Sequence, residues 1–241
     1  MLKAILFDMD GLIFDTESIY RQSWQFAGAE QGLQITDDTY QQFIGVQDPE
    51  CERILAEHFQ NAIDMTRYRA VRDAHFHQLR EQGIGLKTGF DGLFSAIKLR
   101  GLTTALVTSS HRPNVLYNFA PFNYLDQFDL IITAEDVQHG KPHPECYQMA
   151  YRKLGLKSQQ CLVLEDSNNG IKAALAAGCH AVMIPDLLPP QTELMSDITV
   201  LDNLAQVIPL LDSYEPKATS CEIRCAGFLI ELGYHLHTLA L

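Results

Sequence analysis

Lysine and arginine are scarce in this chain. Its 241 residues include 18 basic residues against 30 aspartates and glutamates, which gives a formal net charge of −12. Such an acidic protein is poorly suited to bind nucleic acid or an anionic membrane surface. The same charge repels anionic substrates at long range, so a phosphate site in this chain has to be made positive locally.

Long apolar runs are also missing. No uninterrupted apolar stretch is long enough to span a bilayer. Lys3 leads directly into a short apolar segment and then into acidic residues, a pattern unlike that of a signal peptide. We therefore expect a cytoplasmic protein that has no membrane partner.

The chain lacks any C-x-x-C pair, and its six cysteines are widely scattered. In a cytosolic protein this distribution predicts free, buried thiols and no disulfide framework. Cys221 and Cys225, followed by His235 and His237, faintly suggest a metal site, but their spacing does not match the usual structural zinc patterns. We reject a metal site there.

What the chain does contain is ordinary for a globular protein, with 46% hydrophobic and 20% charged residues. Its length suits a core domain with a modest insertion. Residues 36–85 contain no convincing strand, and their apolar positions are typical of short amphipathic helices. We interpret residues 17–86 as a helical insertion whose two connections act as hinges.

The core is expected to begin with a buried strand over residues 4–7, followed by Asp8, Asp10 and the turn-forming Gly11. Side chains two apart in an extended segment point the same way, so both acids should face one pocket. Two ionised carboxylates at such a short distance repel each other unless they share a cation or a proton. The alternative is a polar turn in which both acids are merely solvated.

Further strands are expected over residues 103–107, 129–133, 161–164 and 181–184, alternating with helices. The strand over 103–107 ends in Thr108-Ser109-Ser110, whose hydroxyls and N–H groups can bind phosphate or can simply cap a helix.

Lys141 follows the expected strand over residues 129–133 and lies between Gly140 and Pro142. Prolines stiffen this loop, and a rigid ammonium can neutralise a carboxylate and a phosphate together. A surface lysine in a proline-rich turn is the alternative. Glu165 and Asp166 follow the expected strand over residues 161–164 and can complete an oxygen-rich site for Mg²⁺.

The order of these four motifs resembles the haloacid dehalogenase superfamily, and within it the β-phosphoglucomutase-like phosphatases with a helical cap. The resemblance covers residues 2–212, and the four motifs in order are far more specific than any one alone. It implies an α/β fold with a doubly wound, mostly parallel, Rossmann-like sheet. Residues 1–16 and 87–212 would form the core, and residues 17–86 the inserted cap.

The resemblance also implies a Mg²⁺-dependent phosphatase acting on a small phosphorylated metabolite, either a sugar phosphate or a nucleoside-type monophosphate. Asp8 would be the nucleophile that forms an aspartyl phosphate, and Asp10 the general acid and base. Thr108, Ser109 and Lys141 would hold the phosphoryl group. Mg²⁺ would be bound by Asp8, the Asp10 carbonyl and Asp166, with Glu165 bound directly or through water.

Two alternatives stay open: a phosphosugar mutase, and a binding protein without turnover on the same fold. The mutases carry a histidine where Tyr20 stands, and an arginine just after a Gly-Val pair in the cap. Here Gly45-Val46 is followed by Gln47-Asp48, and an acid repels a second phosphate. Both departures favour hydrolysis, although Arg53 or Arg69 could supply a substitute cation.

Residues 213–241 extend past the end that the family pattern predicts, and we assign them no role. They contain an apolar stretch over residues 226–230. We expect a monomer, with self-association through this extension as the alternative.

Overall fold

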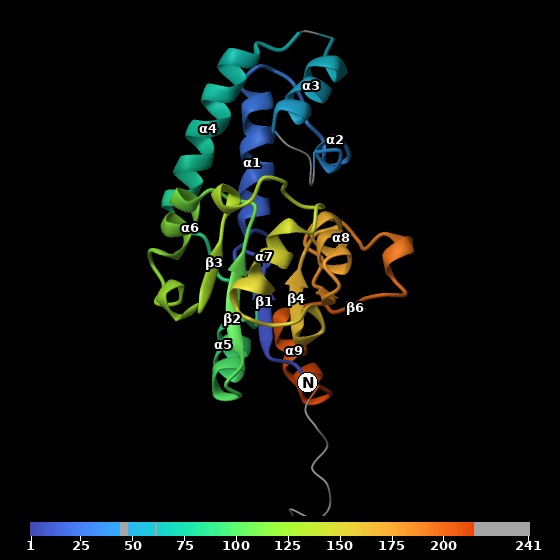
Figure 1. Ribbon diagram of the computed structural model, residues 1–241. Helices are drawn as coiled ribbons and strands as arrows, with labels where there is room; N and C mark the ends of the chain where they lie inside the picture. The colour runs from blue at the N-terminus through green and yellow to red at the C-terminus, as the bar shows by residue number, and fades with distance from the viewer. Residues whose placement is uncertain (44–47, 61, 215–241) are drawn as a thin grey trace, which may run out of the picture.

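The computed structural model describes residues 1–43, 48–60 and 62–214 (Figure 1). Its centre is a six-stranded sheet in the order β3-β2-β1-β4-β5-β6, with every neighbouring pair parallel. The strands are β1 (Ala4–Phe7), β2 (Thr103–Val107), β3 (Leu130–Ile132), β4 (Cys161–Glu165), β5 (His180–Met183) and β6 (Thr199–Val200). The α/β fold with a doubly wound, parallel sheet is confirmed.

The central strand β1 is buried along its whole length. Parallel strands covered on both faces are continuously apolar, and the sequence Ala-Ile-Leu-Phe meets that requirement. In its two ladders Phe7 pairs with Leu106 of β2 and with Leu164 of β4. The residues that follow these three strands therefore meet at one edge of the sheet.

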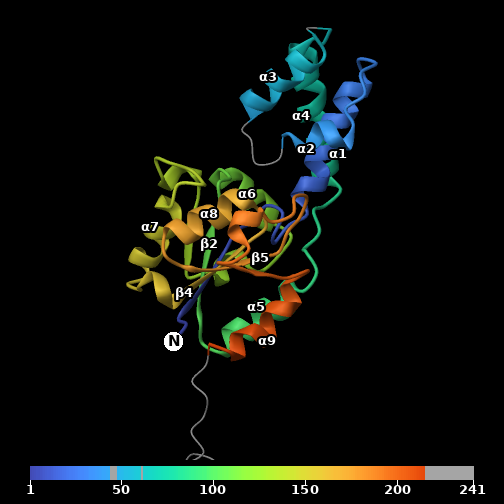
Figure 2. The ribbon, with the colours of Figure 1, turned by 90° about the vertical axis from the view of Figure 1, so that its right-hand side faces the viewer.

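Helices cover both faces of the sheet (Figure 2). Alternate strand residues point to opposite sides, so Phe7 packs with one hydrophobic cluster and Leu6 with the other. The first cluster includes residues of α5 (Phe90–Leu99), α6 (Arg112–Phe119) and α9 (Val207–Asp212). The second includes residues of α7 (Glu145–Lys153) and α8 (Asn168–Ala176).

In the described residues between β1 and α5, four helices form a separate unit, which Figure 1 shows standing beyond one end of the sheet. They are α1 (Thr16–Ala29), α2 (Asp37–Gln41), α3 (Asp48–His58) and α4 (Met65–Glu81). The unit has its own core, in which Trp24 packs against Phe43 and Tyr68. The Tyr68 hydroxyl donates a hydrogen bond of 2.9 Å to the Trp24 carbonyl. The expected helical cap region is present.

The two connections between the cap region and the sheet lie side by side. Phe14 and Leu86 form an antiparallel bridge. The Lys87 N–H donates to the Ile13 carbonyl at 2.8 Å, and the Asp15 N–H donates to the Gly85 carbonyl at 3.3 Å. This pairing is consistent with domain boundaries at residues 16/17 and 86/87. The division into core and cap domains at these positions stays a prediction.

Arg80, near the end of α4, joins the cap region to α6 of the core. It is only 6% exposed. Its Nη2 and Nε atoms both donate to Asn118 Oδ1, at 2.7 and 3.0 Å, and its guanidinium carbon lies 3.9 Å from the centre of the Tyr117 ring. Because α6 follows the Thr108–Ser110 segment, this contact couples the cap to the edge of the sheet where the strands end.

We expect Arg80→Ala to lower the free energy of unfolding by about 1–3 kcal/mol, because it leaves the buried Asn118 Oδ1 without these donors. Urea denaturation measures the change. The matched control is Arg67→Ala, which removes an exposed cap arginine bonded to the Glu30 carbonyl. Equal losses in the two variants would contradict a special role for the Arg80 contact.

No helix within the described ranges is long and apolar enough to cross a membrane. Four described cysteines are buried and take part in no disulfide, as expected, namely Cys51, Cys146, Cys161 and Cys179. Cys221, Cys225, His235 and His237 lie outside the described residues, as does the proposed self-association segment.

Candidate active site

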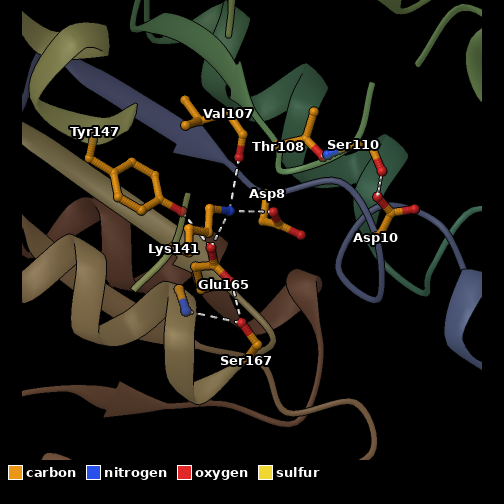
Figure 3. Close-up of polar contacts among 10 residues, drawn as sticks. Asp8, Asp10, Val107, Thr108, Ser110, Lys141, Tyr147, Glu165 and Ser167 are labelled. Atoms are coloured by element: carbon orange, nitrogen blue, oxygen red, sulfur yellow. Dashed lines mark hydrogen bonds and ion pairs between the residues drawn. The ribbon is translucent and has the colours of Figure 1, made fainter. Parts of the chain in front are cut away.

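Lys141 and Asp8 form the centre of the site (Figure 3). Asp8 directly follows β1, and Lys141 lies in the loop before α7. The Lys141 Nζ atom lies 2.5 Å from Asp8 Oδ1, 2.6 Å from Glu165 Oε1 and 3.0 Å from the Val107 carbonyl oxygen. An ammonium has three N–H donors, and these three acceptors use them all.

The Lys141 side chain is 8% exposed, so its charge needs compensation. Burial alone lowers the pKa of an ammonium, but Asp8 and Glu165 outweigh that effect and hold the pKa of Lys141 above its ordinary value. The lysine therefore stays charged. The peptide bond between Lys141 and Pro142 is cis. The loop thus brings Lys141 beside the Asp8 carboxylate, and the role of this pair in a phosphate site stays a prediction.

Glu165, the last residue of β4, is fully buried. Its Oε1 also accepts a 2.5 Å hydrogen bond from the Tyr147 hydroxyl, and its Oε2 accepts one of 3.2 Å from Ser167 Oγ. A Cβ atom at Gly170 would lie 1.9 Å from the carboxyl carbon of Glu165, so only glycine fits there. Tyr147 was missed by sequence reasoning, because an aromatic residue on an amphipathic helix is normally assigned to the core.

Asp10 lies two residues after Asp8, just before the turn at Gly11, and is paired with Ser110 (Figure 3). Ser110 Oγ donates to Asp10 Oδ2 at 2.6 Å, and the Ser110 N–H donates to Thr108 Oγ1 at 3.0 Å. Burial raises the pKa of Asp10, and the Ser110 hydrogen bond offsets part of that rise. Ser109 is exposed and lines the same cavity as Thr108.

Asp166 completes an acidic group with Asp8 and Glu165. Carboxylate oxygens of the three residues lie within 4.8 Å of one another. Burial raises the pKa of Asp166, as do the charges of Asp8 and Glu165, and burial also raises the pKa of Asp8. Only oxygen ligands are present, which is the donor set that Mg²⁺ prefers. The group therefore fits a hard divalent cation.

Gly11 makes the close approach of these acids to the turn possible. Its φ is +79°, and a Cβ atom there would lie 2.3 Å from Asp166 Oδ2. The same position is 3.3 Å from Asp186 Oδ2. Any side chain at Gly11 would displace the acids.

Three further charged residues beside the site were missed by sequence reasoning. Lys87, in the second connection, donates to Asp186 Oδ1 at 2.5 Å, although 99 residues separate them. The Asp186 Oδ2 atom is buried and has no hydrogen-bond partner among the described residues. Burial, with the charges of Asp10 and Asp186, raises the pKa of Glu17 to about 7. The positions of these three residues depend on tertiary contacts, so no local sequence pattern predicts them.

A cavity of about 550 Å³ lies at this edge of the sheet. Six of the seven predicted site residues line it, and Glu165 lies directly behind Lys141. The six are Asp8, Asp10, Thr108, Ser109, Lys141 and Asp166. Glu17 lines the same cavity from the start of α1. Within the described part of the chain, Lys141 is the only lysine or arginine in the lining.

The raised pKa values predict how pH acts on the metal-free protein. A carboxyl whose pKa is raised by folding binds more protons in the folded state, so the free energy of unfolding falls as pH rises between its unfolded and folded pKa values. For Glu17 this window runs from 4.5 to about 7. In EDTA we therefore expect the protein to be less stable at about pH 8 than at about pH 5, and Mg²⁺ to restore more stability at the higher pH.

Asp166→Asn tests this account, because it removes one of the buried charges and keeps the side-chain shape. We expect the variant to be more stable than the parent in EDTA at about pH 8, and to gain less stability from Mg²⁺. The control is Asp197→Asn, an exposed acid outside the site. Thermal unfolding with and without Mg²⁺ measures both effects. An unchanged response to Mg²⁺ in Asp166→Asn would contradict the assignment.

Comparison with known proteins gives matches over most of the chain. The family model "Haloacid dehalogenase-like hydrolase" matches residues 5–184. A phosphorylated carbohydrates phosphatase of Thermotoga maritima is 26% identical over 185 residues, covering 75% of this chain and 84% of that protein. A Saccharomyces cerevisiae protein named "probable pseudouridine-5'-phosphatase" is 31% identical over 196 residues, covering 76% of this chain and 83% of that protein.

The fold is likewise similar to a solved structure. The crystal structure of CbbY from Rhodobacter sphaeroides in complex with phosphate superposes with a TM-score of 0.67 at 25% identity. The match covers 86% of this chain and 96% of that one.

Proposed function

Because the chain belongs to the haloacid dehalogenase-like hydrolase family, in its β-phosphoglucomutase/CbbY-like subfamily, and is a phosphatase by homology, we propose that it hydrolyses a small phosphomonoester through an aspartyl phosphate on Asp8. The observation that carries the proposal is the 2.5 Å contact between Lys141 Nζ and Asp8 Oδ1, at the wall of a cavity that also holds Asp10. An ammonium held against one carboxylate oxygen leaves the other oxygen to attack phosphorus.

Asp10 is suited to move the proton. Its raised pKa favours the protonated acid, which can give a proton to the leaving alcohol oxygen as the phosphorus–oxygen bond breaks. The resulting carboxylate can then take a proton from the water that hydrolyses the aspartyl phosphate. Ser110, bonded to Asp10 Oδ2, holds the carboxyl in one orientation throughout.

Thr108 and Ser109 line the cavity and supply donors for the phosphoryl oxygens, while Lys141, whose three N–H groups are already used, balances their charge. Thr108 Oγ1 already accepts a hydrogen bond from the Ser110 N–H, so its own hydroxyl proton is available to donate to phosphate. Lys141 supplies the local positive charge that an acidic protein requires. These groups stabilise charge on the phosphoryl oxygens and position the phosphoryl group for attack.

We assign Mg²⁺ to the oxygen cluster of Asp8, Glu165 and Asp166, with Asp10 contributing as the family resemblance implies. The three carboxylates are close enough to share one ion. When bound, the ion supplies positive charge that offsets both the acids and the phosphoryl oxygens. Because Glu165 already accepts bonds from Lys141, Tyr147 and Ser167, contact through a water suits it best.

The leaving group is proposed to be a neutral, hydroxyl-rich moiety, a sugar or nucleoside. This agrees with relatives named for phosphorylated carbohydrates and for a pseudouridine 5'-phosphate. Beyond the phosphoryl-binding groups, the polar side chains of the described lining hydrogen-bond hydroxyls, the carboxylate of Glu17 repels a second anion, and the His111 ring is already paired with Glu135. These polar side chains include Glu17, His111, Gln138, Asn168, Asn169 and Gln191.

The mutase alternative requires a cation for a second phosphate. Arg53 forms ion pairs with Glu50 and Glu57, Arg69 forms one with Glu52, and neither lines the cavity. Tyr20, where the mutases carry a histidine, stacks on Phe76 at 4.5 Å. Residues 45–47 lie outside the described residues.

A phosphate-release screen over sugar phosphates and nucleoside monophosphates, with Mg²⁺, tests the function. We expect inorganic phosphate from at least one of them and negligible isomerisation of β-glucose 1-phosphate. Glucose 6-phosphate formed faster than free phosphate would favour the mutase. Failure on every ester, with saturable binding of one of them, would favour a binding protein.

A further inference from the structure

Two histidines flank Lys141 in the loop before α7 and share one carboxylate. His139 Nδ1 lies 3.0 Å from Glu145 Oε2, and His143 Nδ1 lies 3.9 Å from the same oxygen. The two imidazole rings are 4.7 Å apart between centroids. The Glu145 N–H also donates to His143 Nδ1 at 3.3 Å, a long contact that a metal at this nitrogen would replace. Two ring nitrogens and one carboxylate oxygen therefore lie close together.

The spacing of these atoms suits a four-coordinate transition metal. Bonds of about 2.0–2.2 Å in a tetrahedral site place neighbouring ligand atoms about 3.3–3.6 Å apart. The two measured separations, 3.0 and 3.9 Å, bracket that range, and ligand atoms of the three residues all lie within 4.8 Å of one another. Both histidine side chains are more than half exposed, at 63% and 51%, so water can complete the coordination.

The carboxylate is already fixed in place. Glu145 Oε1 accepts from the Gln138 N–H at 2.9 Å, and Oε2 accepts from the His139 N–H at 3.0 Å. The hydrogen bond from the Gln138 N–H lowers the pKa of Glu145 most. The contacts with the His139 ring and the His139 N–H lower it further, so the carboxyl stays ionised. The His143 N–H donates to the Gly140 carbonyl at 3.0 Å, which holds the second half of the loop.

We propose that His139, His143 and Glu145 bind one divalent transition metal of the zinc type, at a site separate from the Asp8–Glu165–Asp166 cluster. Imidazole nitrogens favour Zn²⁺, whereas an all-oxygen site favours Mg²⁺, so ligand chemistry distinguishes the two sites. Any proton that His139 Nδ1 shares with Glu145 Oε2 passes to solvent when the metal binds. Lys141 lies between the two histidines, so the bound ion fixes both ends of the segment that presents its ammonium to Asp8.

Calorimetric titration of the full chain with Zn²⁺, in a large excess of Mg²⁺, tests this site without reference to activity. We expect the parent to bind Zn²⁺ and the His139→Ala/His143→Ala variant to bind it about 100-fold more weakly or worse, since two ligands are lost. Two variants serve as controls that should keep the affinity: His235→Ala/His237→Ala and Asp166→Asn. If the alanine variant unfolds in EDTA, His139→Gln/His143→Gln replaces it.

Co²⁺ gives a second readout, because its visible absorption reports nitrogen and oxygen coordination of low symmetry. The spectrum should persist in Asp166→Asn and disappear in His139→Ala/His143→Ala. Three results would overturn the site: no Zn²⁺ binding by the parent, unchanged affinity in the His139/His143 variant, or loss of binding in His235→Ala/His237→Ala alone. None of these results bears on the phosphatase proposal, which rests on other residues.

Discussion

Asp8→Asn is expected to abolish phosphate release, with a loss of about 10⁴–10⁶ in kcat, because an amide cannot form the aspartyl phosphate. The fold should survive, since asparagine keeps the shape of the buried side chain. Asp10→Asn should lose less, about 10²–10⁴, the range for one general acid–base group. Steady-state phosphate release with the best ester of the screen measures both losses.

The control for these substitutions is Asp197→Asn, an exposed acid outside the cavity, which should keep full activity. Circular dichroism shows whether each variant is folded. Full activity in folded Asp8→Asn, or in the parent with excess EDTA, would refute the proposed chemistry.

Lys141→Met is the second large effect that we expect. It leaves Asp8 and Glu165 buried without their cation, and breaking a buried ion pair from one side costs about 3–5 kcal/mol of stability. Activity should fall by at least about 10²–10³, the range for one lost charge-stabilising donor. Lys153→Met, which changes an exposed lysine on α7, is the matched control.

Adding Glu165→Gln to Lys141→Met separates the two effects. The double variant removes one of the unpaired buried charges, so its free energy of unfolding should exceed that of Lys141→Met. Its activity should stay low, because the ammonium is still absent. A double variant with restored activity would show that Lys141 acts only by stabilising the fold.

The chain predicts those parts of the site that lie at strand ends. Asp8, Thr108 and Asp166 each follow an apolar run, and a parallel sheet necessarily brings the carboxyl ends of its strands to one edge. Lys141 was expected from its stiff loop, although 133 residues separate it from Asp8. In these cases a local pattern and a simple topological rule together place the side chain.

Other residues could not be predicted, because their environment arises only from packing. Tyr147 has the spacing of an ordinary core residue, yet its hydroxyl reaches Glu165. Arg80 would be assigned to solvent on an amphipathic helix, but it is buried between α4 and α6. The pairing of Lys87 with Asp186 depends on how the second connection passes the loop after β5.

The most direct test of the account is to trap the phosphoryl group on the protein. In Asp10→Asn, an aryl phosphate whose leaving group needs no proton should still phosphorylate Asp8, while hydrolysis of the intermediate lacks its base. We predict that acid quenching followed by mass spectrometry will find one phosphoryl group on the peptide that contains Asp8, and none in Asp8→Asn/Asp10→Asn. Turnover of the ester with no covalent phosphoryl group, or with that group on another residue, would contradict the account.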